Sequence, residues 1–220
     1  LMTSGTSSTA ALAFGGEDSS RLDVTEVWNG TNWTEVNDLN TGRGEGGGAG
    51  TSTAALAFAG ASGPTSILAI TESWNGTNWT EVNDLNTARY QTTSGLGRVS
   101  TAALLAGGRT PGSPVVAVTE SWNGTNWTEV NDLNTARSAA AGQTGTNTSA
   151  LVVGGNLTAV TEEWNGASWV EVADLSTTRS GAGGAGASTA AAVVFGGNPP
   201  SYTATEEWSS SSTVIKTLTD

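Results

Sequence analysis

The stretch Val118-Thr-Glu-Ser-Trp-Asn-Gly-Thr-Asn-Trp-Thr-Glu-Val-Asn-Asp-Leu-Asn-Thr-Ala-Arg137 decides the fold of this chain. It recurs almost unchanged at residues 70–89 and, with Gly in place of one Ala, at residues 24–43. A diverged copy covers residues 160–179, and the opening of a fifth copy begins at Ala204. The first Trp of each copy stands at positions 28, 74, 122, 164 and 208, so the spacings are 46, 48, 42 and 44 residues. Five copies at such a period are the signature of a repeat array, in which no unit buries its apolar face alone.

Each repeat is typical of four short strands. A stretch of small residues comes first, at 3–6, 45–50, 90–97, 138–145 and 181–187, and it predicts an inner strand beside a crowded axis. An apolar run closed by small residues follows, at 10–16, 54–60, 102–108, 149–155 and 190–197, and predicts a strand buried on both faces. Next comes an alternating strand of the Val-Thr-Glu-Val-Trp kind. An Asn-Gly pair then predicts a hairpin into the strand of the second Trp, because both residues tolerate positive φ.

Four antiparallel strands per unit at this period predict a β-propeller blade. The density of Gly, Thr, Asn and β-branched residues disfavours helices. We therefore predict one all-β domain over residues 1–220, a five-bladed propeller with blades at about 1–39, 40–85, 86–133, 134–175 and 176–220. Both ends fall at a blade boundary, so we expect closure by face-to-face packing of blades one and five.

The composition excludes several kinds of chemistry. The chain has no Cys and no His, which removes disulfides, thiolate chemistry, the usual zinc sites and imidazole acid–base catalysis. No spaced Asp-x-Asp-x-Asp loop for calcium is present either, so we expect no metal and no cofactor. The net charge of −12 disfavours nucleic acid and anionic membranes as partners. We see no signal peptide and no apolar run long enough to cross a membrane, and expect a soluble chain.

The repeat as a whole resembles the kelch repeat. The matching features are the apolar run with its Gly pair, a variable loop, a strand with an acidic residue and an aromatic residue, and Asn-Gly-Thr-Asn-Trp. Trp28 and its equivalents stand where the kelch Tyr would be, and Ala88-Arg89 stands where Pro-Arg would be. The resemblance covers the whole chain and implies a kelch-like propeller. Kelch propellers include binding modules and a copper oxidase, but the His and Cys of that oxidase site are missing here.

The near-identical copies also resemble repeats in predicted structural or tail-associated proteins of marine bacteriophages, cyanophages especially. That resemblance implies a virion-associated or extracellular location, with cell-surface glycans or other virion proteins as partners. It identifies no functional residue.

Two sets of repeated side chains have both a binding and a structural interpretation. Trp can stack on sugars, but its recurrence at fixed places favours packing between blades. The nine are Trp28, Trp33, Trp74, Trp79, Trp122, Trp127, Trp164, Trp169 and Trp208. The repeated charges are Glu26, Glu72, Glu120, Glu162 and Glu206 with Arg43, Arg89, Arg137 and Arg179. They fit a ring of binding charges at the channel mouth or, as we favour, buried Glu–Arg pairs between blades. Met2 is expected at the position of the missing fifth Arg, which leaves Glu206 or Glu26 without a partner.

The non-repeated residues are the better candidates for binding. The loops at 17–23, 61–69, 109–117, 156–159 and 198–204 differ in every blade and are expected on one face of the disc. Loops on a rigid scaffold often carry binding residues. The candidates are Arg21, Arg109, Asn156, Asn198 and Tyr202. The alternative is neutral drift in loops that contact nothing.

The sequence favours a binding or structural module without catalytic activity, recognising host surface glycans through these loops. One alternative is a polysaccharide hydrolase, which needs two carboxyl groups about 5–10 Å apart. The adjacent acids are Glu162-Glu163, Glu206-Glu207 and Glu17-Asp18. Neighbours on a strand point to opposite faces, which argues against such a pair. The other alternative is a natural or engineered repeat scaffold selected for folding alone.

Overall fold

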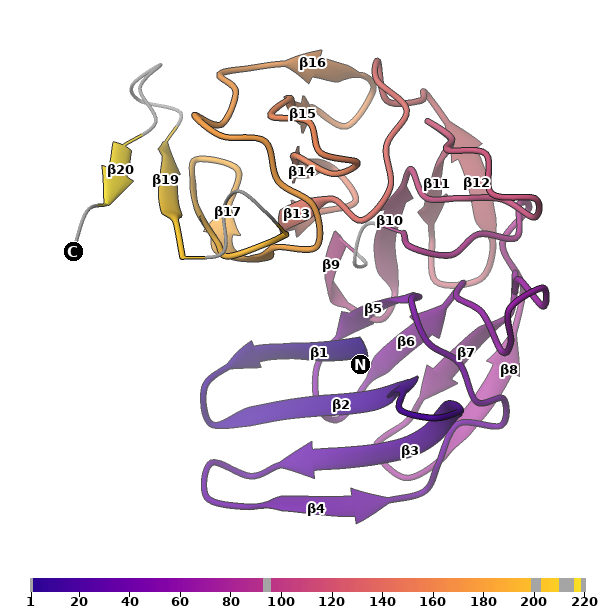
Figure 1. Cartoon of the computed structure of the whole chain (residues 1–220). Coiled ribbons are helices and arrows are strands. Elements are labelled where there is room, and N and C mark those ends of the chain that lie inside the picture. The colour runs from indigo at the N-terminus through magenta and orange to yellow at the C-terminus, as the bar shows by residue number, and fades with distance from the viewer. Residues whose placement is uncertain (1, 93–95, 199–202, 210–215, 219–220) are drawn as a thin grey trace.

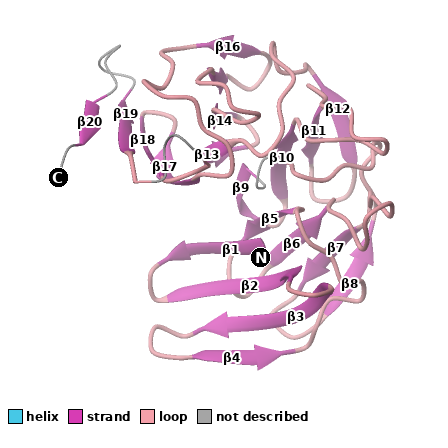
Figure 2. Cartoon of the chain, in the orientation of Figure 1, coloured by secondary structure: helices cyan, strands magenta, loops and turns pink. Residues whose placement is uncertain are grey.

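The computed structural model describes residues 2–92, 96–198, 203–209 and 216–218, and all regular structure in these ranges is β-strand (Figure 2). Twenty strands form five four-stranded antiparallel sheets, each built from consecutive strands. The sheets are arranged in a ring around a common axis (Figure 1). The fold is a five-bladed β-propeller, as the repeat predicts.

The strand bounds follow the repeat. Sheet 1 contains β1 (Met2–Ser7), β2 (Ala10–Glu17), β3 (Arg21–Trp28) and β4 (Trp33–Val36). Sheet 2 contains β5 (Gly47–Gly50), β6 (Ala55–Phe58), β7 (Thr71–Trp74) and β8 (Trp79–Val82). Sheet 3 contains β9 (Leu96–Val99), β10 (Ala102–Ala106), β11 (Thr119–Trp122) and β12 (Trp127–Val130). Sheet 4 contains β13 (Ala141–Thr146), β14 (Ser149–Val153), β15 (Thr161–Trp164) and β16 (Trp169–Glu171). Sheet 5 contains β17 (Gly183–Ser188), β18 (Ala191–Phe195), β19 (Thr205–Ser209) and β20 (Lys216–Leu218).

The first strand of each sheet is the innermost one, and its closest approaches to neighbouring sheets are made at glycine. β5 lies against both β1 and β9, and β13 against both β9 and β17. A Cβ atom on Gly48 of β5 would come within 2.7 Å of the carbonyl oxygen of Thr3 on β1. A side chain at that position would therefore force neighbouring blades apart.

The second strand of each sheet carries the core. Every residue of β6 is buried, and β10 and β14 are buried apart from their first residue. Successive side chains of such a strand point to opposite faces of the sheet, so one strand contributes to the interfaces with both neighbouring sheets. Leu56 and Phe58 pack toward sheet 3, whereas Ala55 and Ala57 pack toward sheet 1.

The Asn-Gly hairpins form where they were predicted, but with a different geometry. Trp122 pairs with Trp127, so the loop has four residues rather than two. Only Gly124 takes a positive φ, of 95°. The side chain of Asn123 instead accepts hydrogen bonds from the backbone N–H groups of Thr125 and Asn126, each at 2.9 Å. The Asn-Gly pair therefore favours this hairpin in two ways: the glycine adopts a positive φ, and the asparagine side chain accepts hydrogen bonds from the loop backbone.

The junction between the first and last sheets differs from expectation. Sheets 1 and 5 are each built from one end of the chain, as predicted. The expected face-to-face packing of blades one and five is not what the structure shows, since Trp33 and Phe195 are each 47% exposed. The ribbons of the two sheets stand apart on that side of the ring (Figure 1).

The first variable loop is shorter than predicted, because β2 and β3 pair as far as Glu17 and Arg21.

Candidate functional site

The repeated Arg and Glu residues tie each blade to the next. Nη2 of Arg89 lies 2.8 Å from Oε1 of Glu120, and both side chains are fully buried. Oε2 of Glu120 accepts from the backbone and the side-chain amide of Asn86 at 2.7 and 2.8 Å. Burial lowers the pKa of Arg89, and the charge of Glu120 opposes that effect. The corresponding pairs are Arg43–Glu72, Arg137–Glu162 and Arg179–Glu206. These charges are enclosed between blades and do not form a ring open to a ligand.

The expectation for Met2 is wrong. Met2 pairs with Phe14 as Gly47 pairs with Phe58, so these two positions are equivalent. Arg43 stands four residues before Gly47, which places the equivalent of Arg43 ahead of residue 1. Met2 is 3% exposed and belongs to the core between sheets 1 and 2.

Glu206 or Glu26 was expected to lack an arginine partner, and the structure distinguishes the two. Glu206 has its partner in Arg179, with 2.6 Å between Oε1 and Nη2. Glu26 makes no ion pair with any residue that the structure describes.

Seven of the nine Trp side chains are buried between blades. Nε1 of Trp127 donates to Oγ1 of Thr71 at 2.9 Å, and its ring meets Phe58 edge-on with 4.9 Å between centroids. These indoles are therefore not sugar-stacking surfaces. Trp33 is the exception at 47% exposure, because no sheet covers its side of sheet 1, and Trp28 beside it is half-buried.

Three of the five predicted binding residues meet on the face that carries the variable loops, here called the variable-loop face. Arg109, Asn156 and Asn198, from blades three, four and five, line one hollow of about 530 Å³. Gln91 and Ala139 complete its inner side. Each of the three predicted residues directly follows the Gly pair of its blade, which brings them to corresponding places around the axis.

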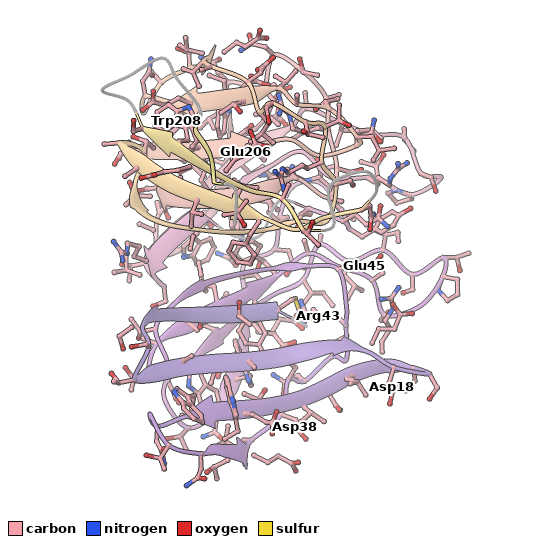
Figure 3. All side chains as sticks on the ribbon, turned by 60° about the vertical axis from the view of Figure 1, so that its left-hand side comes forward. Asp18, Asp38, Arg43, Glu45, Glu206 and Trp208 are labelled. Carbon is pink, nitrogen blue, oxygen red and sulfur yellow. The ribbon has the colours of Figure 1, made fainter. Side chains whose placement is uncertain are left out.

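A chain of hydrogen bonds joins the fourth predicted residue to this hollow. Nη2 of Arg21 lies 3.1 Å from Oε2 of Glu45, whose Oε1 accepts from the side-chain amide of Gln91 at 3.0 Å. Gln91 in turn accepts from Nε of Arg109 at 3.0 Å. Nη1 of Arg109 donates to the carbonyl of Ser113 at 2.8 Å, which fixes the guanidinium. Figure 3 shows Glu45 on the same side of the molecule as the loop of Asp18.

The backbone around the hollow takes conformations that side chains usually avoid. Gln91, Ala139, Asn156 and Leu157 have φ values of 47°, 48°, 48° and 59°. Non-glycine residues with positive φ are uncommon and cluster at ligand sites, where the surrounding structure holds them. Glu45 and Gly181, at the equivalent place of their linkers, have φ values of 59° and 65°, so this conformation belongs to the repeated linker as well as to the hollow.

A second hollow adjoins the first between the two longest variable loops. It has a volume of about 210 Å³ and is lined by Pro64, Pro111 and Tyr90, among others. The hydroxyl of Tyr90 lies 3.1 Å from Oγ of Ser113. The backbones of Tyr90 and Arg109 are hydrogen-bonded to each other at 3.0 and 2.8 Å, which joins the two hollows.

The acids offer little for hydrolysis. Glu162 and Glu206 are buried in ion pairs with Arg137 and Arg179. In each of the adjacent acid pairs, one carboxylate is therefore inaccessible to a substrate. Two non-repeated carboxylates do meet on this face, since Arg21 binds Glu17 at 2.6 Å and Glu45 at 3.1 Å. Both carboxylates thus bind the same guanidinium.

The described residues contain no group of three or more His, Cys, Asp or Glu side chains that could hold a metal ion. Within the same residues, no helix is long and apolar enough to cross a membrane.

Sequence reasoning did not single out Gln91 and Ala139, which line the hollow. Each stands two positions after a repeated Arg, at the place that Glu45 and Gly181 hold in the other linkers. The linkers differ at this place and on both sides of it, so the repeat gave no signal that would have identified these residues. Tyr202 lies outside the residues that the structure describes.

No model of a known protein family matches the chain, and no curated protein sequence matches it either.

Proposed function

We propose that this protein is a non-catalytic binding module whose ligand site is the hollow between Arg109, Asn156 and Asn198. One observation carries the proposal: three non-repeated polar side chains from three different blades converge on one hollow of about 530 Å³. The repeat brings these three positions together, and each of them carries a side chain that can donate hydrogen bonds to a ligand.

The chemistry of the hollow favours a saccharide. The amides of Asn156 and Asn198 each donate and accept hydrogen bonds, which suits neighbouring sugar hydroxyls. Among the described residues, Nη2 of Arg109 has no hydrogen-bond partner, and a guanidinium prefers a carboxylate. Tyr90 supplies an aromatic ring of the kind on which the apolar face of a sugar stacks. We therefore propose a surface glycan of a host cell, with preference for sugars that carry a carboxylate.

A virion-associated or extracellular location is part of the proposal. Its support is the resemblance of the tandem units to repeats of marine bacteriophage proteins. A rigid disc with variable loops on one face suits attachment to a cell surface.

The test is binding to an array of glycans and bacterial envelope polysaccharides. Arg109→Ala and Asn156→Ala should each weaken binding about tenfold, a loss of about 1.4 kcal/mol, because each removes hydrogen bonds to the ligand. Thr125→Ala on the opposite face is the matched control and should bind as the wild type does. Both sets of variants should keep the wild-type circular dichroism spectrum.

A loop exchange extends the test. Replacing residues 61–69 and 109–117 by the short loop of residues 156–159 removes Tyr90's neighbours and Arg109 together. Binding that survives this exchange, or the two substitutions, would place the site elsewhere. Absence of binding by the wild type would leave a structural part or a scaffold as the better hypothesis.

Hydrolysis is the second candidate, favoured only by the meeting of Glu17 and Glu45 on Arg21. It predicts release of reducing ends from a bound polysaccharide and loss of that release in Glu45→Gln. We expect no release, and sustained release by the wild type would replace the binding-module proposal.

A further inference from the structure

Each sheet has two different faces, and every interface inside the chain joins one kind to the other. The forward face presents apolar side chains of the second strand, such as Leu56 and Phe58 of β6. The receiving face of the next sheet presents its Trp side chains, such as Trp122 and Trp127. These four residues share one buried cluster, and corresponding positions meet in the other three interfaces.

One forward face is left without a partner sheet, on sheet 5. Phe195 stands at the position of Phe14 and Phe58, since each pairs with the first Thr of its neighbouring strand. It is 47% exposed, whereas Phe14 and Phe58 are fully buried. Val193 of the same strand lines an apolar hollow of about 300 Å³ on sheet 5.

One receiving face is left as well, on sheet 1. Trp33 is 47% exposed, whereas its equivalents Trp79, Trp127 and Trp169 are each 5% exposed. Its ring lies 5.6 Å from that of Trp28, in the tilted arrangement that the other Trp pairs share. The receiving surface is therefore formed but uncovered.

The two uncovered faces match each other as the covered ones do. Phe14 meets Trp79 edge-on at 5.0 Å, so Phe195 and Trp33 are the corresponding pair. Thr25 accepts a hydrogen bond from Nε1 of Trp79 at 3.0 Å, and Thr205 is its equivalent on sheet 5. Both halves of a fifth interface are present in one chain.

The geometry of the ring separates these halves within one molecule. Figures 1 and 3 both show the ribbons of sheets 1 and 5 apart. The four existing interfaces repeat the same packing positions, with the Trp–Thr hydrogen bond at 2.9–3.1 Å in three of them. Closing the ring would require the packing at one or more of these interfaces to change, whereas a second molecule can approach either face without such a change.

We propose that the forward face of sheet 5 docks on the receiving face of sheet 1 of a second copy of this chain. The contact is head-to-tail, so each added copy leaves one face of each kind uncovered and assembly can continue. Glu26 and Glu207 lie on sheets 1 and 5, and the chain carries a net charge of −12. Added salt therefore strengthens the association, because it screens repulsion between copies.

The test is sedimentation velocity over a concentration series. The wild type forms dimers and larger species as its concentration rises. Trp33→Glu and Phe195→Glu each stay monomeric and folded, because the residue replaced is exposed in the single chain. The matched control is Val170→Glu, which alters a side chain that is 50% exposed on the outer strand of sheet 4, and it assembles as the wild type does.

Mixing the two variants gives the sharpest outcome. Trp33→Glu keeps the face of sheet 5 intact, and Phe195→Glu keeps the face of sheet 1 intact. An equimolar mixture therefore forms a one-to-one heterodimer and nothing larger. A wild type that stays monomeric at all concentrations, or a mixture without heterodimer, would overturn the proposal. Assembly that persists in either variant alone would overturn it too. None of these outcomes depends on the glycan-binding proposal.

Discussion

In three of the four interfaces, a single threonine hydroxyl links one blade to the next. Oγ1 of Thr119 accepts a hydrogen bond from Nε1 of Trp169 at 3.1 Å, across a fully buried contact. Thr161 occupies the same position one blade later, but its Oγ1 is buried without a partner among the described residues. The repeat places Thr213 where the donating Trp would stand, since Trp208 is followed five residues later by Thr rather than Trp. One residue change therefore removes a hydrogen bond that three other interfaces contain.

This difference predicts opposite effects for the same substitution. Thr119→Val should destabilise the protein by about 1–3 kcal/mol, because it leaves a buried indole N–H without an acceptor. Thr161→Val should be neutral or stabilising, because it replaces an unpaired buried hydroxyl by a methyl group of similar shape. Chemical denaturation measures both. Equal losses in the two variants would show that Thr161 has a partner after all.

Blades one to four are completed by polar side chains that bond to the backbone. Asp132 accepts the backbone N–H of Thr119 at 3.0 Å, at the place where the outer strand ends. Its equivalents in blades one, two and four do the same for Thr25, Thr71 and Thr161. At the other end, the Asn of the hairpin closes the four-residue loop. The outer strands are short, so these side-chain bonds fix their register.

The hairpin Asn gives a prediction at the scale of the element. Asn123→Ala should destabilise the protein by about 1 kcal/mol, because two loop N–H groups lose their acceptor. Thr125→Ala in the same loop is the matched control, and we expect no change in the free energy of unfolding. Thermal denaturation distinguishes the two. A neutral Asn123→Ala variant would assign the hairpin to its glycine alone.

The whole molecule is an array of sheets whose hydrophobic core consists of the interfaces between neighbouring sheets. Sheets 2, 3 and 4 are packed on both faces, whereas sheets 1 and 5 each pack on one. In such arrays the stability of a unit depends on its own folding and on its neighbour interfaces. Sheet 5 combines one uncovered face with the missing indole at position 213. It is therefore the least stabilised unit.

Native-state hydrogen exchange tests this gradient. At a concentration where the protein is monomeric, amides of β18 should exchange about tenfold faster than those of β10, a difference of about 1.4 kcal/mol in opening free energy. The reason is that β10 is buried on both faces and β18 on one. Equal protection of the two strands would indicate that the five sheets open as one unit.

The candidate site was predictable in part. Arg109, Asn156 and Asn198 were accessible to sequence reasoning because they break a repeat, and up-and-down strands place all such loops on one face. Gln91 and Glu45 were not singled out, because they lie in the stretches of small residues that predict the inner strands rather than in the variable loops. Their role depends on left-handed backbone at the axis, where chain segments distant in sequence meet.

The repeat was enough to predict the kind of blade, the number of blades and the approximate place of each strand. Those features recur along the chain, so periodicity, Gly pairs and Asn-Gly loops specify them without knowledge of distant contacts. The structure confirmed the favoured interpretation that the Glu–Arg pairs are enclosed between blades. It also showed that Met2 belongs to the core and that Trp33 and Phe195 remain exposed, neither of which was predicted. The reason is that the angle between sheets is set by packing across four interfaces in succession, and no single repeat encodes their sum.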